Sequence, residues 1–117
     1  MKSSIIIWHN NRCGKSREAV KYLEDKGLNF EQRLYMTELP TKAELKDVLK
    51  KLGIPASEWV RKKEAIYKEL FAGKTPTEDE IIDAMLAHPQ LIERPVIVKG
   101  NKAIIARPAS EMDKILG

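Results

Sequence analysis

The sequence of 117 residues contains a single cysteine and no long apolar run. One cysteine cannot form an internal disulfide bond, so Cys13 is either small apolar filler or a chemical reagent. No run approaches the roughly 20 apolar residues of a membrane helix, and the opening MKSSIIIW is too short for the apolar region of a signal peptide. We therefore expect one cytoplasmic domain over residues 1–117, with no membrane partner.

Cations are in only slight excess, with a net charge of +4, and they alternate with acids as on solvated helix faces. No basic stripe carries aromatic residues, so nucleic-acid binding is not expected. No Cys/His cluster and no Gly-rich phosphate loop are present, so neither a metal nor a bound cofactor is expected. The charge suits a small anionic substrate, and the lack of a surplus apolar stripe favours a monomer.

The first third of the chain has the pattern of a strand, a helix and a second strand. Residues 5–8 form a short run of β-formers typical of a strand buried on both faces. A polar segment follows, and residues 15–26 have helical spacing that ends at Gly27. Residues 29–35 alternate as a second strand does. A helical crossover between neighbouring strands predicts a parallel, right-handed βαβ unit.

The remainder predicts a helical middle and a final hairpin. Capping boxes start helices at Thr41 and Thr77, and Gly53 ends the first of them. The other predicted elements are short helical pieces over 55–73, a helix end near His88, a hairpin of strands 95–99 and 102–106, and a short helix over 110–116. The whole order indicates an α/β fold with a four-stranded mixed sheet flanked by helices.

Cys13 lies between the end of the first predicted strand and the start of the first helix. Backbone N–H groups there have no intrahelical partner, and the helix dipole favours negative charge. Such surroundings lower a cysteine pKa from about 8.5 to roughly 3.5–7.5, and the charges of Arg12, Lys15 and Arg17 act in the same direction. The polar neighbours argue against a buried filler, so we predict a nucleophilic thiolate.

Two neighbours of Cys13 have alternative roles. A redox dithiol would need a second cysteine where Ser16 stands, so any resolving thiol must come from another molecule. Ser16 either hydrogen-bonds the thiolate or caps the helix, and a cap is the more ordinary role. His9 is either an acid or base for catalysis or a structural residue held by hydrogen bonds.

The segment from His9 to Arg17, HNNRCGKSR, resembles the active-site loop of the glutaredoxin-coupled arsenate reductase (ArsC) family, typically H-N-P-x-C-G-T-S-R. Asn11 replaces the usual proline, and Lys15 replaces the usual threonine. The resemblance continues in the family's order through residues 59–63, 91–96 and 106–108, so it covers essentially the whole chain. Spx and YffB-type proteins are related to this family.

The resemblance implies a thioredoxin-like, glutaredoxin-like fold with a helical segment inserted between the βαβ and ββα halves. It implies that Cys13 attacks arsenate and that Arg61, Arg94 and Arg107 bind the oxyanion, with Ser16 among the substrate-binding residues. Pro95 corresponds to the cis-proline of thioredoxin folds. Glutathione is then a co-substrate rather than a bound cofactor, and a glutaredoxin completes the reduction of arsenate to arsenite.

Two other functions fit the same residues. A glutathione-linked thiol reductase acting on another oxyanion or on a mixed disulfide is kept open by Asn11 and Lys15, which lie beside the nucleophile. An Spx-like regulator that binds RNA polymerase would tolerate loss of Cys13, although Ser16 excludes the usual C-x-x-C switch. We also expect the charge of Lys15 to lower the pKa of Cys13 further than a threonine would.

Overall fold

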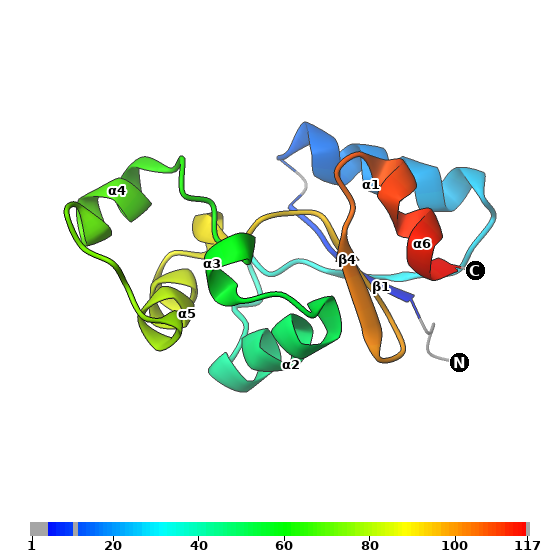
Figure 1. The fold of residues 1–117 in the computed structure, drawn as a ribbon. Helices are drawn as coiled ribbons and strands as arrows, with labels where there is room; N and C mark the ends of the chain where they lie inside the picture. The colour runs from blue at the N-terminus through cyan, green and yellow to red at the C-terminus, as the bar shows by residue number, and fades with distance from the viewer. Residues whose placement is uncertain (1–4, 11, 117) are drawn as a thin grey trace. The chain divides into compact units, whose positions relative to one another are not determined.

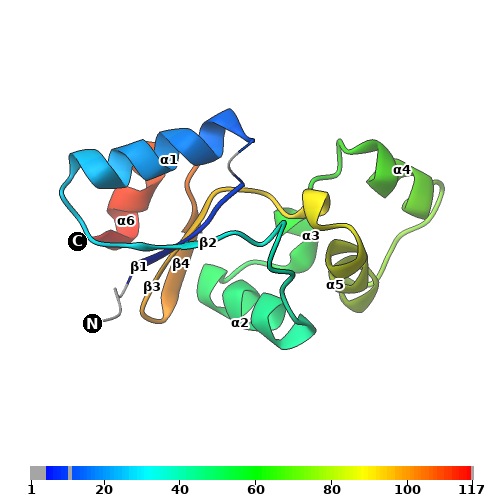
Figure 2. The same ribbon diagram turned by 180° about the vertical axis from the view of Figure 1, so that it is seen from behind.

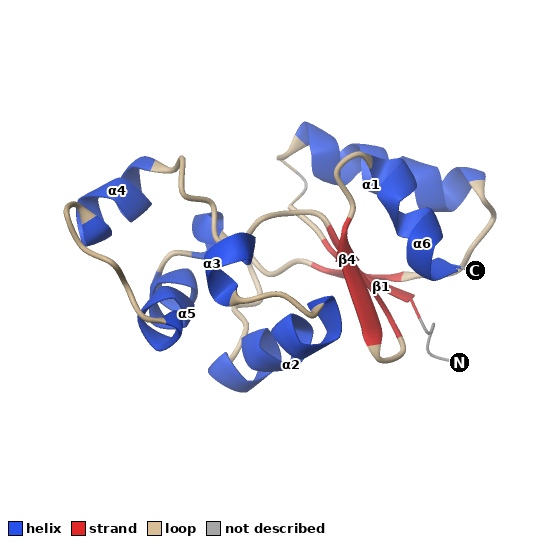
Figure 3. Ribbon diagram, in the orientation of Figure 1, coloured by secondary structure: helices blue, strands red, loops and turns tan. Residues whose placement is uncertain are grey.

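The structure is a computed structural model that describes residues 5–10 and 12–116. The chain divides into two compact units, each described here by itself: a sheet unit, up to Glu38 and from Arg94 onward, and a helical unit, Leu39–Glu93. Figure 3 shows that the strands all belong to the first of these units. The helical unit is the predicted insertion between the two halves of the α/β fold. Within the described ranges, no helix has the length and apolar character to cross a bilayer.

The sheet unit contains four strands in the order β2-β1-β3-β4. Strand β1 pairs in parallel with β2 and antiparallel with β3, and β3 pairs antiparallel with β4. This arrangement confirms the predicted mixed sheet. The elements of this unit are β1 (Ile5–Trp8), α1 (Gly14–Asp25), β2 (Glu31–Arg33), β3 (Val96–Lys99), β4 (Lys102–Ile105), a 3₁₀ turn (Ala109–Met112) and α6 (Asp113–Leu116).

Helices α1 and α6 lie on the same face of the sheet (Figures 1 and 2). Alternate residues of a strand share a face, so Ile5 and Ile7 of β1 both point into one apolar cluster. Ala19 and Leu23, four residues apart on α1, enter the same cluster. The remaining buried members are Ile97, Ala106 and Met112. This core holds α1, the helix that follows Cys13, against the sheet.

Strand β2 is shorter than the predicted strand over residues 29–35. It covers only Glu31–Arg33, because the Tyr35 N–H donates to the Arg33 carbonyl at 3.0 Å and turns the chain out of the ladder. Tyr35 is fully buried and stacks on Trp8 with ring centroids 5.8 Å apart. Burying the Tyr35 ring stabilises the fold more than a longer edge strand β2 would. The predicted last helix likewise begins as a 3₁₀ turn before α6.

The helical unit confirms both predicted capping boxes. Thr41 accepts from the N–H of Glu44 at 3.2 Å, and Thr77 accepts from the N–H of Glu80 at 3.2 Å. Helix α2 (Lys42–Leu52) ends at Gly53, whose φ of 70° lies in the left-handed region that glycine adopts at low cost. The elements of this unit are α2 (Lys42–Leu52), α3 (Ala56–Trp59), α4 (Ala65–Phe71), α5 (Glu78–Ala87) and a 3₁₀ turn (Pro89–Leu91).

A short antiparallel bridge ties the segment after α3 to the last residues of the helical unit. Val60 pairs with Ile92, and the N–H of Arg61 donates to the Leu91 carbonyl at 2.7 Å. The Trp59 indole N–H donates to the Glu93 carbonyl at 3.1 Å. The Trp59 side chain is fully buried. This bridge therefore holds the chain immediately before Arg94.

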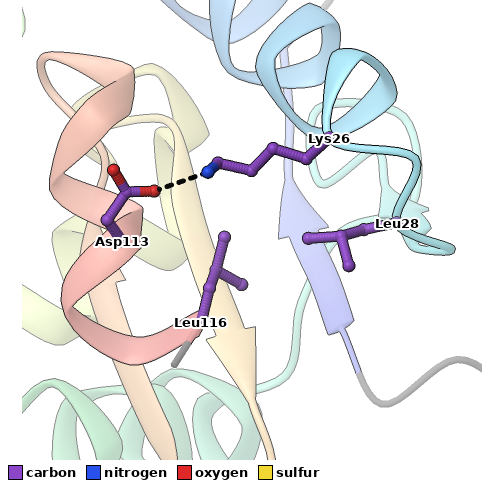
Figure 4. Close-up of a pocket in the computed structure, with 4 residues that line it drawn as sticks. All are labelled: Lys26, Leu28, Asp113 and Leu116. Carbon is purple, nitrogen blue, oxygen red and sulfur yellow. Dashed lines mark ion pairs between the residues drawn. The ribbon is translucent and has the colours of Figure 1, made fainter.

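A polar cluster on the surface joins α1 to α6. Asp113 accepts from the Tyr22 hydroxyl at 2.7 Å and pairs with the ammonium of Lys26 at 3.2 Å. Lys26 and Asp113 border an open pocket of about 340 Å³ together with Leu28 and Leu116 (Figure 4). This pocket lies at the C-terminal end of α1, whereas Cys13 lies at its N-terminal end.

Asp113→Asn is expected to destabilise the fold slightly and to flatten its acid sensitivity. Hydrogen bonds from Tyr22 and Lys26 lower the pKa of Asp113 in the folded chain. The stabilisation is therefore complete above the unfolded carboxyl pKa of about 3.9 and is lost as pH falls through the lower folded value. Thermal melts of both proteins across that range test this, and parallel curves would contradict it.

Candidate active site

Cys13 is the N-cap residue of α1. Its backbone is extended, with φ −96° and ψ 125°, and its carbonyl accepts the first helical hydrogen bond from the N–H of Arg17 at 3.1 Å. The Cys13 N–H donates to the Asn10 carbonyl at 2.9 Å, which closes the turn between β1 and α1. The side chain is half-buried. The structure thus places the thiol at the helix start, as the sequence predicts.

The pKa of Cys13 is lowered from its ordinary value. Burial of the thiol acts to raise it, but hydrogen bonds from the backbone N–H of Ser16, the side chain of Arg94 and the backbone N–H of Lys15 lower it. The positive charge of Arg94 lowers it further. Each of these donors stabilises the thiolate over the neutral thiol. The balance favours a nucleophilic sulfur.

The source of positive charge differs from the sequence-based expectation. Arg94 supplies it, whereas the sequence predicts Arg12, Lys15 and Arg17 for that role. The Lys15 ammonium pairs instead with the carboxylate of Glu18 at 3.6 Å, one helical turn along. A helix directs its side chains away from its own axis, so sequence neighbours need not face the sulfur. Asn11, the other departure from the family's loop, lies outside the described residues.

Lys15→Thr is therefore expected to leave the pKa of Cys13 unchanged. The substitution keeps the backbone N–H that reaches the sulfur and removes only a side chain paired with Glu18. The pH dependence of Cys13 alkylation by iodoacetamide measures this directly. A profile displaced toward higher pH in the variant would restore a role for the Lys15 charge.

Ser16 holds the loop that carries Cys13. It is fully buried, and its hydroxyl oxygen accepts a hydrogen bond from the Asn10 N–H at 3.3 Å. The expected helix cap is wrong, because α1 has no side-chain cap at its start. The backbone N–H of Ser16, rather than its hydroxyl, contributes to the pKa of the thiol. A direct contact of Ser16 with substrate remains a prediction.

His9 is buried beside the same loop, with 5% of its surface exposed. Burial lowers its pKa, and the charge of Arg17 lowers it further, so the imidazole is neutral near pH 7. Its Nδ1 has no hydrogen-bond partner among the described residues. Its backbone N–H donates to the Arg33 carbonyl at 3.0 Å, which joins the end of β1 to β2. A catalytic role for this imidazole remains a prediction.

Arg94 and Arg107 lie close together, Arg94 before strand β3 and Arg107 after strand β4. The Nη1 of Arg107 donates to the Arg94 carbonyl at 3.1 Å. The Arg94–Pro95 peptide bond is cis, and so is Arg107–Pro108, for which the sequence contained no signal. Sequence reasoning also missed the Arg107 contact, because nothing in a sequence shows which carbonyl a distant guanidinium reaches.

Arg61 belongs to the helical unit and contacts two carboxylates there. Its Nη1 lies 3.7 Å from Glu64, and its Nε lies 4.0 Å from Glu93. A quarter of the Arg61 side chain is exposed. These acids offset its charge in the absence of substrate. Binding of an oxyanion by Arg61 therefore remains a prediction, and its two glutamate partners were not expected from the sequence.

The sheet unit places a thiol of lowered pKa beside the guanidinium of Arg94. A thiolate at a helix start repels an approaching anion, and guanidinium groups offset that repulsion while offering several donors. Among the described residues, no three His, Cys, Asp or Glu side chains form a group that could hold a metal ion.

Comparison with known proteins agrees with this arrangement. A family model described as "ArsC family" matches residues 8–115. The chain belongs to the ArsC family. An uncharacterized relative, YfgD of Escherichia coli K12, is 41% identical over the full length of both chains. A relative named arsenate reductase, from Neisseria meningitidis (strain Z2491), is 37% identical over 96% of this chain and 97% of its own.

A solved structure of a similar protein has the same fold. The arsenate reductase from Vibrio cholerae superposes with a TM-score of 0.92 at 36% identity, covering 98% of this chain and 99% of the other. The resemblance drawn from the Cys13 loop is thereby confirmed, as is the thioredoxin-like fold class.

Proposed function

We propose that this chain reduces arsenate to arsenite, with Cys13 as the nucleophile. The observation that carries the proposal is the thiol at the start of α1, with its pKa lowered by the Ser16 N–H and the Arg94 guanidinium. ArsC relatives of similar length, including the Neisseria meningitidis protein, are named arsenate reductases, which supports the choice of substrate.

In the proposed reaction, the thiolate of Cys13 attacks the arsenic atom, and one arsenate oxygen leaves as water after protonation. Arg94 and Arg107 donate hydrogen bonds to the remaining oxygens and offset their charge. Arg61 and Ser16 are proposed as further substrate contacts. The neutral imidazole of His9 can accept the proton that the Cys13 thiol loses and then give it to the leaving oxygen, and this acid and base role is the one proposed for it.

Completion of the cycle needs two thiols that this chain does not contain, since Cys13 is its single cysteine. We assign them to glutathione and a glutaredoxin. These two thiols lose one electron each and join as a disulfide, arsenic gains both electrons, and the bond between arsenic and Cys13 breaks, which returns the thiolate. Over the whole cycle, arsenate loses one oxygen, as one net water. Such thiols are plentiful in a reducing compartment, so we propose that the protein works in the cytoplasm. We also propose that it is a monomer and that it binds no cofactor.

A coupled assay tests the proposal. Consumption of NADPH is followed with glutathione reductase, glutathione, glutaredoxin and arsenate present, and then with each of the last three omitted in turn. We expect turnover only in the complete mixture. Turnover without glutaredoxin would reassign the second thiol donor, and no turnover in the complete mixture would reject arsenate as substrate.

One observation favours a second candidate. Because Arg61 is already contacted by Glu64 and Glu93, the chain also suits a glutathione-linked reductase that relies little on Arg61, acting on a different oxyanion or on a mixed disulfide. Such an enzyme would turn over a glutathione mixed disulfide and ignore arsenate. An Spx-like regulator would turn over neither and would instead bind RNA polymerase.

A further inference from the structure

The carbonyl of Arg94 is held by a side chain from the end of the neighbouring strand. Strands β3 and β4 pair with Val96 opposite Ile105, and the Ala106 N–H donates to the Pro95 carbonyl at 2.9 Å. Arg94 and Arg107 are the next residues on either side, just beyond the bond between Pro95 and Ala106. The Nη1 of Arg107 donates to the Arg94 carbonyl at 3.1 Å.

This contact stands where the backbone ladder ends. A hydrogen-bonded pair of antiparallel residues exchanges two bonds, but Pro95 has no N–H and can only accept. The pair Pro95 and Ala106 is therefore held by one backbone bond rather than two. The Arg107 guanidinium adds a side-chain donor just beyond it, and so fixes the carbonyl of Arg94.

The residue that is held in this way is the one whose side chain reaches the nucleophile. Arg94 donates a hydrogen bond to the sulfur of Cys13 and places its charge beside it. An arginine side chain has many rotamers, so a stable contact with the sulfur depends on a well-placed backbone. Arg107 has five N–H donors, and one bond to a carbonyl leaves others for different partners.

We propose that Arg107 is a positioning residue for Arg94, holding it where its guanidinium meets the Cys13 thiolate, in addition to any contact of Arg107 with substrate. The consequence for turnover rests on the proposed function. The consequence for the reactivity of the thiol does not, because it concerns only residues of the sheet unit and needs no substrate.

A double-mutant cycle on thiol reactivity tests this proposal. Cys13 is the sole cysteine, so the rate of reaction with iodoacetamide reports on it alone. At a pH at which the wild-type thiol is only partly ionised, we expect Arg94→Met to slow alkylation roughly tenfold and Arg107→Met about threefold. Since Arg107 acts through Arg94, Arg107→Met should slow the Arg94→Met protein no further.

Additive effects in the double variant, or no effect of Arg107→Met alone, would overturn the proposal. Arg107→Lys keeps a donor of similar reach and should recover part of the rate. Arg12→Met removes a charge next to Cys13 in sequence and should leave the rate unchanged, which controls for charge alone. Circular dichroism confirms that each variant is folded. If the variants react with iodoacetamide as expected but the protein does not turn over arsenate, the proposed function is rejected and the positioning role of Arg107 stands.

Discussion

Cys13→Ser is expected to abolish reductase turnover, by roughly 10³-fold or more, while the fold is kept. A serine hydroxyl stays protonated near neutral pH, so the hydrogen bonds from Arg94 and the Ser16 N–H have no thiolate to stabilise. The cysteine side chain is half-buried and makes no capping hydrogen bond to α1, so the fold depends little on it. The coupled NADPH assay with arsenate measures the loss.

Cys13→Ala serves as the second variant, because it removes the polar atom altogether. Both proteins should have the circular dichroism spectrum and the melting temperature of the wild type within a few degrees. Turnover that persists in either folded variant would show that Cys13 is not the nucleophile. Loss of folding in both would show instead that the residue is structural.

Trp59→Ala is expected to lower the free energy of unfolding by about 3–5 kcal/mol, the range for truncating a large buried aromatic side chain. Trp59 is fully buried, and its indole N–H donates to the Glu93 carbonyl at 3.1 Å. The substitution leaves a cavity and removes that donor. Urea denaturation followed by circular dichroism measures the change.

Leu70→Ala is the matched control, since Leu70 belongs to the same helical unit and is 39% exposed. Its truncation should cost less than about 1 kcal/mol, as surface substitutions usually do. Trp59→Phe keeps a ring and loses the donor, so its cost should fall between the two. Equal costs for Trp59→Ala and Leu70→Ala would contradict the structural role assigned to Trp59.

The predictions that the structure confirms rest on signals contained within a few consecutive residues. Thr41 with Glu44 and Thr77 with Glu80 form their capping boxes because both partners lie within one helical turn. The hairpin of β3 and β4 forms at the predicted place because a turn of only two residues joins its strands. The position of Cys13 at a helix start is likewise local information.

The predictions that differ from the structure concern partners chosen by packing. Strand β2 is short because Tyr35 leaves the edge of the sheet to stack on Trp8. Ser16 was expected to cap α1, but its oxygen meets the Asn10 N–H instead. Neither outcome is encoded in spacing, because each depends on where two separate segments come to lie.

The sequence by itself therefore determined the α/β order of elements, the helix boundaries set by caps and glycines, and the position of Cys13 at the start of a helix. Only the tertiary structure decided that Arg94, rather than Lys15, places its charge beside Cys13, and that Arg107 holds the carbonyl of Arg94. The physical reason is the distance along the chain over which each kind of interaction acts. Caps and periodicity act over a single turn, whereas the charge on a thiol is set by whichever guanidinium the packed sheet brings within hydrogen-bonding distance.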